Sequence, residues 1–329
     1  MKTNRKYNDS KFLYLVPVFP IVFSIFFGCS NKPGVTNAPA SMSLTRQDKA
    51  TLAALDKTIA KAKAGAMSGY FGKVDLLMNR VPYLKKTKRG RFAVVTPLLE
   101  SIGSSAALPM IEKLRHKEKP GGFSESSWIA WRIGLLEALS DFKDKRALIV
   151  AKDILLDPNT GEPVARAAAS AIGTLGGEQE SEMLISIASK KDEKGLAVLT
   201  ALGRAREPNV IEFLGRVMST DTDRARIKAA VRSMRTLANK WAWRSGSLGT
   251  RDEQEEFQQK ATRKLLIGFK AHFQDPLLNE EFVKALEVVD WPGATGILDA
   301  MMEHASSQGL QKALSELKTR LENNPLNRK

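Results

Sequence analysis

The residue of this chain best suited to covalent chemistry is its single cysteine. Cys29 ends a run of large apolar residues in the stretch IVFSIFFGCSNKPG at 21–34. A thiol in this position can serve as a buried apolar side chain, a nucleophile or a point of attachment. An intramolecular disulfide within these 329 residues is excluded, because no second cysteine exists. The small, polar residues that follow Cys29 favour attachment.

Other residue types that carry chemistry show no spacing typical of an active site. The GYFGK stretch at 69–73 lacks the spacing, and the following serine or threonine, of a phosphate loop. The histidines are scattered, without the spacing of metal ligands, at His116, His272 and His304. We therefore expect no catalytic residue, no metal and no cofactor, and predict that the chain is not an enzyme.

Two neighbouring groups of residues suit binding. On a helix expected over 222–239, an apolar stripe is formed by Ile227, Val231, Met234 and Leu237. On another face lies a cationic strip without interleaved acids, consisting of Arg224, Lys228, Arg232 and Arg235. The strip is followed by Trp241, Trp243 and Arg244, whose residue types are enriched in interface hot spots. The alternatives are a solvated helix face for the strip and core packing for at least one tryptophan.

The composition favours a folded, helical and strongly basic protein. Hydrophobic residues make up 43% and charged residues 26%, which allows a substantial core. From about residue 45, Ala, Leu, Lys, Arg and Glu dominate, as in all-α chains. The formal net charge of +15 favours an anionic partner. A second basic cluster, which touches anionic lipid or merely adds solubility, consists of Lys85, Lys86, Lys88, Arg89 and Arg91.

The first 44 residues have the three-part layout of an export signal. Residues 1–11 are polar and basic, 12–28 are almost wholly apolar, and 30–44 are small and polar. Seventeen apolar residues span roughly 25 Å as a helix, less than a hydrocarbon core of about 30 Å. Pro17 and Pro20 also kink such a helix. We predict a cleaved signal peptide over 1–28 and a flexible tether over 29–44.

The stretch Phe26-Phe27-Gly28-Cys29 resembles the lipobox of bacterial lipoproteins, with Phe26 and Phe27 in place of the usual leucine and small residue. The resemblance implies that the Cys29 thiol is joined to diacylglycerol and that the signal is cut before Cys29. The new amino terminus then receives an acyl chain such as palmitate. Ser30, where aspartate would retain the protein in the inner membrane, implies release to the outer membrane. An unmodified cysteine in a signal or membrane helix is the alternative.

An internal repeat organises the remainder of the chain. Six segments share a small residue followed by a large apolar one, at Ser101, Ala138, Ala171, Ala201, Ser233 and Ala285. Four of the five intervals lie between 30 and 37 residues, close to one two-helix unit. Most segments are followed by a second apolar stretch. The pattern predicts an all-α fold, a right-handed α-solenoid of about six helix pairs. A globular helical bundle is the alternative.

The segment VARAAASAIGTLG at 164–176 is similar to HEAT repeats, as is 285–302. The resemblance implies HEAT-like repeats over 90–305. We expect N-terminal capping helices over 45–89, and a C-terminal capping helix and tail over 306–329. The longest interval predicts an insert near 239–254, after which Arg251 to His272 resumes as a long helix. Insertions in repeat proteins often carry binding function.

These features predict a non-catalytic, lipid-anchored scaffold on the periplasmic face of the outer membrane. Its solenoid surface would bind a protein or an acidic envelope component. The alternative is a nucleic-acid-binding protein, because HEAT-like DNA glycosylases are also basic solenoids; the export signal argues against it. A resemblance to phycobilin-attaching lyases rests on repeat architecture alone.

Overall fold

The computed structural model describes residues 42–84, 92–243, 250–324 and 326. The predicted signal peptide, Cys29 and most of the tether lie outside these residues. So does the basic cluster at 85–91. Within the described part of the chain every regular element is a helix, and none of these helices is long and apolar enough to cross a membrane.

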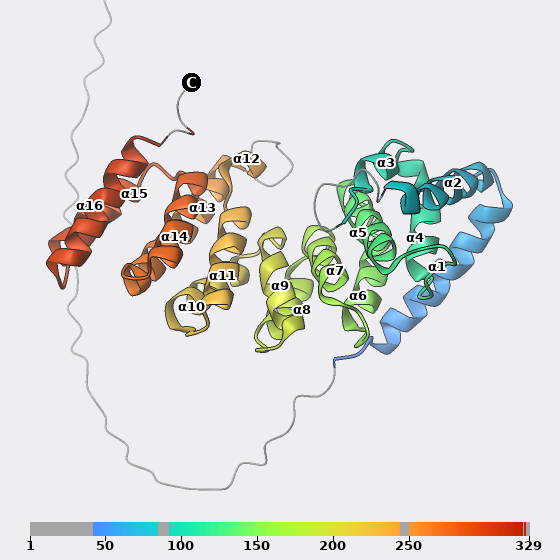
Figure 1. The fold of residues 1–329 in the computed structure, drawn as a ribbon, viewed down its shortest axis with the longest axis horizontal. Helices are drawn as coiled ribbons and strands as arrows, with labels where there is room; N and C mark the ends of the chain where they lie inside the picture. Colours follow the sequence, from blue (N-terminus) through green and yellow to red (C-terminus); the bar gives the residue numbers. More distant parts are fainter. Residues whose placement is uncertain (1–41, 85–91, 244–249, 325, 327–329) are drawn as a thin grey trace, which may run out of the picture. The chain divides into compact units, whose positions relative to one another are not determined.

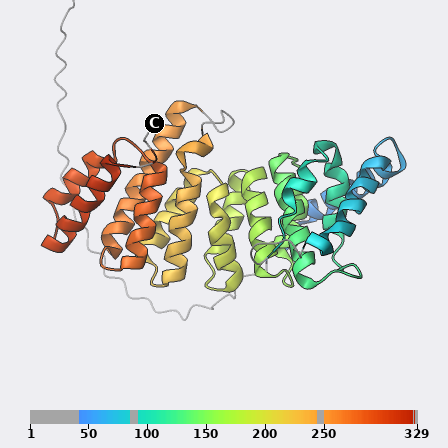
Figure 2. The same ribbon diagram turned by 45° about the horizontal axis from the view of Figure 1, so that its top comes forward.

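Most helices belong to two layers (Figures 1 and 2). The first layer consists of α3 (Thr96–Glu100), α5 (Glu125–Asp141), α7 (Glu162–Leu175), α9 (Glu193–Ala201), α11 (Arg224–Leu237) and α14 (Pro276–Val289). The second consists of α4 (Ala107–Arg115), α6 (Ala147–Leu156), α8 (Glu178–Ala188), α10 (Pro208–Thr220), α13 (Arg251–His272) and α15 (Ala294–Glu303). The other elements are α1 (Arg46–Ala64), α2 (Ser68–Leu84), α12 (Lys240–Trp243), α16 (Gln308–Glu322) and the 3-10 turns η1 (Ser104–Ala106) and η2 (Leu202–Arg204).

Contacts between the layers follow the order of the chain. Each first-layer helix packs against the next one, from α3 through α5, α7, α9 and α11 to α14. Each second-layer helix from α6 onward packs against the first-layer helix that follows it, and α15 packs against α16. Contacts between sequence neighbours are typical of a solenoid. The prediction of an all-α solenoid is confirmed.

Five of the six small residues of the repeat are buried in first-layer helices. Ala138, Ala171, Ala201 and Ala285 are buried. Ser233 is also buried, and its hydroxyl donates a hydrogen bond of 2.6 Å to the Leu199 carbonyl of α9. These side chains let neighbouring backbones approach closely.

For Ser101 the predicted packing role is wrong. This residue follows the short helix α3, is exposed, and donates its hydroxyl to the Leu98 carbonyl of the same helix at 2.7 Å. Because α3 has only five residues, its small residue falls at the end of the helix and not at a contact between helices.

Local sequence explains where two long helices begin. Thr45 caps α1, and the Asp48 carboxylate accepts the Thr45 N–H in return. Thr250 and Glu253 form the same reciprocal capping box at the start of α13. The helix expected from Arg251 to His272 is therefore present with those bounds.

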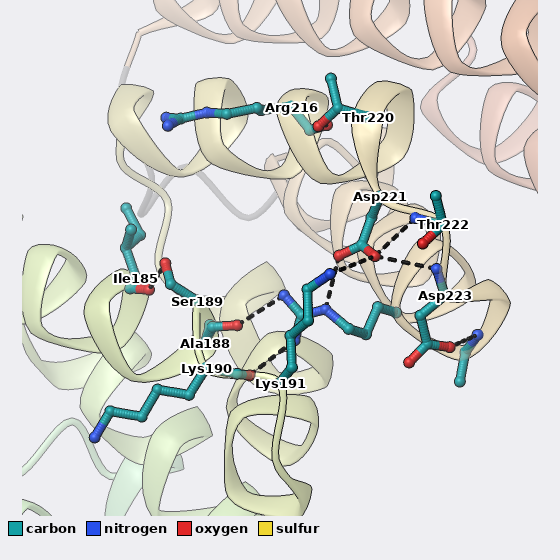
Figure 3. Close-up of polar contacts among 12 residues, drawn as sticks. Ile185, Ala188, Ser189, Lys190, Lys191, Arg216, Thr220, Asp221, Thr222 and Asp223 are labelled. Carbon is teal, nitrogen blue, oxygen red and sulfur yellow. Dashed lines mark hydrogen bonds and ion pairs between the residues drawn. The ribbon is translucent and has the colours of Figure 1, made fainter. Parts of the chain in front are cut away.

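A buried arginine joins three helices of the central repeats. Arg226 lies in the first turn of α11 and is only 4% exposed. Its guanidinium donates to Asp221 Oδ2 at 2.8 Å, to the Lys190 carbonyl at 3.0 Å and to the Ala188 carbonyl at 3.1 Å. Figure 3 shows Ala188, Lys190 and Asp221 around this contact. The arginine thereby ties the end of α8 to the turn between α10 and α11.

Asp221 is held as a carboxylate in this contact, which we call the Arg226 clamp. Burial raises the Asp221 pKa, but hydrogen bonds from Arg226 and from the Asp223 N–H outweigh burial and lower it below its usual value. Lys191 adds an ammonium 3.8 Å from the same carboxylate (Figure 3). Sequence reasoning overlooked Arg226, although it precedes Ala230, Ser233 and Leu237 by helical spacing on the buried face.

Replacing Arg226 by methionine should destabilise the protein strongly. The substitution removes the guanidinium from the largely buried Asp221 carboxylate and from two backbone carbonyls, and breaking a buried pair in this way costs about 3–5 kcal/mol. Urea unfolding followed by circular dichroism measures the change. Arg216→Met is the matched control: Arg216 is exposed on α10, and loss of its charge should change stability by less than about 0.5 kcal/mol. Equal midpoints for the two variants would contradict the clamp.

Candidate functional site

The predicted cationic strip lies on α11, opposite the side chains that this helix buries. The apolar stripe of Ile227, Val231, Met234 and Leu237 is at most 2% exposed. Asp223 caps the helix by accepting the Ala225 N–H at 2.8 Å. Burial of the stripe turns Arg224, Lys228, Arg232 and Arg235 away from the core, and half of the Arg232 side chain (48%) remains accessible.

Helix α14 supplies acids to three of the four strip cations. Arg232 binds Glu281 through two nitrogens, at 3.0 and 2.6 Å, and the Lys228 ammonium lies 3.3 Å from the same carboxylate. Arg224 pairs with Asp275 at 2.7 Å. No acid is interleaved in the strip itself, because its counter-charges come from a helix about 50 residues farther along the chain. The strip therefore bridges α11 to α14.

The arrangement lowers the pKa of Glu281 from 4.5 to about 2. The bidentate hydrogen bonds from Arg232 are the main cause; burial of the carboxyl opposes them, and Lys228 adds to them. Glu281 is 8% exposed, so its charge is well shielded from solvent. Glu281 is thus ionised at neutral pH, and it occupies the two central cations.

Of the other residues predicted to bind a partner, those that the structure describes lie outside the ion pairs between α11 and α14. Arg235 is half-buried, and no acid among the described residues pairs with it. Trp241, on α12, is 49% exposed, and the Lys240 ammonium lies 5.2 Å from its ring centre. Lys240 in turn pairs with Asp290, beyond the end of α14. The side chain of Trp243 lies outside the described part of the structure, as do Arg244 and Cys29.

A hollow of about 410 Å³ lies beside the strip, across α7, α9 and α11. Arg166 of α7, Thr200 of α9, and Lys228 and Arg232 of α11 line it. Two acids also face it, Glu162 and Glu193. The walls therefore carry charges of both signs.

A second hollow of about 280 Å³ continues the first, because Arg166 and Thr200 line both. It extends to Glu137 of α5 and to Arg204, at the end of η2. Arg204 is exposed and has no acid partner among the described residues. We call the two hollows together the first-layer groove, since their walls come from α5, α7, α9 and α11.

The groove suits recognition of a polar surface by exchange of ion pairs. Its cations are Arg166, Arg204, Lys228 and Arg232, and its acids are Glu137, Glu162 and Glu193. Among the described residues, no group of three or more histidines, cysteines or carboxylates is placed to hold a metal ion. Sequence reasoning missed Arg166 and Arg204, because they belong to different repeats and only the packing of α7 against α9 and of α9 against α11 brings them beside the strip.

Comparisons with known proteins assign no family to this chain. No family model matches this chain, and no curated protein matches it. Four solved chains match, and one of them is human deoxyhypusine hydroxylase, whose structure was solved in complex with glycerol. That match has a TM-score of 0.32 and 16% sequence identity, and it covers 79% of this chain and 100% of the solved one.

This match contradicts the expectation that the chain is not an enzyme, because the similar structure is that of a hydroxylase. We therefore do not retain that expectation. With a TM-score of 0.32, the similarity carries no argument for any particular reaction either.

Loss of the Glu281 charge should weaken the contact between α11 and α14. A carboxylate whose pKa falls on folding stabilises the folded state fully above its unfolded pKa, and loses this effect as the pH falls through the folded value. At pH 7 we expect Glu281→Gln to lower the free energy of unfolding by about 1–2 kcal/mol, since half-exposed Arg232 reduces the full effect of the pKa shift. The difference should shrink as the pH falls from 4.5 toward about 2.

Urea unfolding at pH 7 and pH 3 measures this dependence. Glu316→Gln is the matched control, because Glu316 is 69% exposed and lies 3.9 Å from Lys312. The control should match the wild type at both pH values. A Glu281→Gln difference that does not change with pH would exclude the proposed electrostatic cause.

Proposed function

We propose that this chain is a lipid-anchored solenoid of the bacterial cell envelope, which binds a protein or an acidic envelope component through its first-layer groove. The observation that carries the binding proposal is the continuity of the groove over four consecutive first-layer helices. A solenoid surface of this kind offers an extended site to a partner that contacts several repeats at once.

We further propose that the helix pairs are HEAT-like. Buried small residues between first-layer helices support this proposal, with Ala171 and Ala285 in the two segments that resemble HEAT repeats. In this interpretation α1 and α2 precede the repeats as capping helices and α16 closes them.

The cations in the groove and beside it differ in how readily they can bind a partner. Lys228 and Arg232 already share Glu281, so a partner must compete with that carboxylate. Arg204 and Arg235 have no such acid among the described residues. Arg235 is adjacent in sequence to Thr236, which lines the groove together with Arg204. These two arginines are the preferred contacts for an acidic partner.

The lipid anchor is proposed from the sequence. An apolar stretch over 12–28, the Gly28-Cys29 pair and the polar segment after it support processing before Cys29. Two or more acyl chains give stable attachment, whereas one binds only marginally. We propose the periplasmic face of the outer membrane as the location.

Processing at Cys29 predicts a defined mass. In the native host, the mature protein should begin at Cys29, carry acyl chains and fractionate with the membrane. Cys29→Ala should remain unprocessed, with no added acyl mass. Intact mass spectrometry of both proteins measures this. A soluble, full-length, unmodified wild-type chain would contradict the anchor, and the basic solenoid should then be tested for salt-dependent binding to duplex DNA.

Binding through the groove predicts that reversing the charge of two arginines in and beside the groove weakens partner binding. Cross-linking in the host envelope, followed by mass spectrometry, should identify partners that the double variant Arg204→Glu and Arg235→Glu loses. Neither arginine forms an ion pair that holds the described fold together, so the variant should fold.

Arg263→Glu is the matched control, because Arg263 is an exposed arginine on second-layer helix α13, outside the groove. It should retain the same partners as the wild type. Retention of all partners by the double variant would exclude the groove as the binding surface.

A further inference from the structure

Helix α2 presents an unusual outward face near the start of the described residues. Leu76 and Tyr83 are each 69% exposed, and their spacing of seven residues places them on the same side of the helix. Gly69 and Gly72 lie on that side too, and an added Cβ at either would meet no atom within 4 Å. The outward face is therefore an open apolar surface.

Packing within the solenoid does not account for this exposure. Helix α2 buries Phe71, Val74 and Val81 on its opposite side, and it contacts α1, α3, α4 and α5. A helix with apolar residues on both sides is typical of an element that has a second contact.

The charges around this face are of one sign. Lys73 and Arg80 flank Leu76 at helical spacing, and both are exposed. The acid of this helix, Asp75, pairs with Lys113 of α4 at 2.5 Å. No other residue of α2 is acidic. Such a surface complements an anionic one.

An apolar centre with flanking lysine and arginine is the pattern of helices that lie at a membrane surface. Leucine enters the acyl boundary, tyrosine suits the headgroup level, and long basic side chains reach the phosphates. Anionic phospholipid satisfies both features of the α2 face, whereas a purely acidic protein surface would leave Leu76 and Tyr83 in contact with charge.

The chain connection also favours a membrane. Cys29 precedes the Thr45 cap of α1 by 16 residues. Even fully extended, 16 residues span at most about 53–58 Å, so the start of α1 stays within that distance of a bilayer that holds the proposed anchor at Cys29.

We propose that the outward face of α2, defined by Leu76, Tyr83, Lys73 and Arg80, docks on an anionic phospholipid surface. This inference rests on the proposed lipid anchor, to which α2 adds a second point of attachment. The contact adds to the attachment that the acyl chains make, and a basic apolar helix can also bind an anionic surface without them. The contact also fixes which end of the repeat array meets the bilayer.

A fluorophore at position 76 tests the contact directly. Because Cys29 is the chain's one cysteine, Cys29→Ala combined with Leu76→Cys allows full-length protein to be labelled with the polarity-sensitive dye NBD at a single site. We expect a blue shift and at least a twofold gain in intensity with vesicles of phosphatidylglycerol and phosphatidylethanolamine. Lys73→Glu with Arg80→Glu should abolish this response.

Leu277→Cys, labelled in the same way, is the matched control, because Leu277 is 64% exposed on α14. Co-sedimentation confirms that each labelled chain is on the vesicles. No response at position 76 in sedimented protein, or equal responses at 76 and 277, would overturn the proposal. Since these variants lack Cys29, the result does not depend on acylation, which the mass measurement tests separately.

Discussion

Close approach of neighbouring first-layer helices is the constraint on which this structure depends. A second-layer helix can contact two repeats only if the backbones of their first-layer helices lie close together. At the α9–α11 contact, Gly203 faces the Ser233 carbonyl oxygen so closely that a Cβ would clash with it. Gly173 likewise leaves no room for a Cβ beside the Ala205 nitrogen. Small side chains are therefore required where the repeats meet, and the rest of each helix is freer to vary.

This constraint explains how much of the fold the sequence predicts. Small residues recur at intervals near one helix pair, so Ala138, Ala171, Ala201, Ser233 and Ala285 are recognisable at their contacts. Ser101 fits the same pattern but terminates a five-residue helix. The sequence pattern identifies which residues can pack between helices. Whether such a residue reaches a neighbouring helix depends on the length of its own helix.

Charges are harder to predict, because their partners come from other repeats. The strip on α11 has no acid within its own helix, yet Glu281 and Asp275 of α14 neutralise most of it. Arg226 looks like another surface cation in the sequence and instead lies buried against carbonyls of the α8 end. Helical periodicity places Arg226 on the apolar face, but the acceptors that satisfy it become apparent only when the repeats are stacked.

The same neutralisation limits what the groove can recognise. A simple anion gains little from Lys228 and Arg232, because Glu281 already satisfies them with a carboxylate whose pKa is lowered to about 2. A partner gains more if it brings acids to Arg204 and Arg235 and cations to Glu137 or Glu193. The groove therefore favours a partner with charges of both signs, such as a folded protein, over a uniform polyanion. By the same reasoning the strongly basic, acid-free face of α2 is suited to a bilayer, where neighbouring lipid headgroups present the same negative charge.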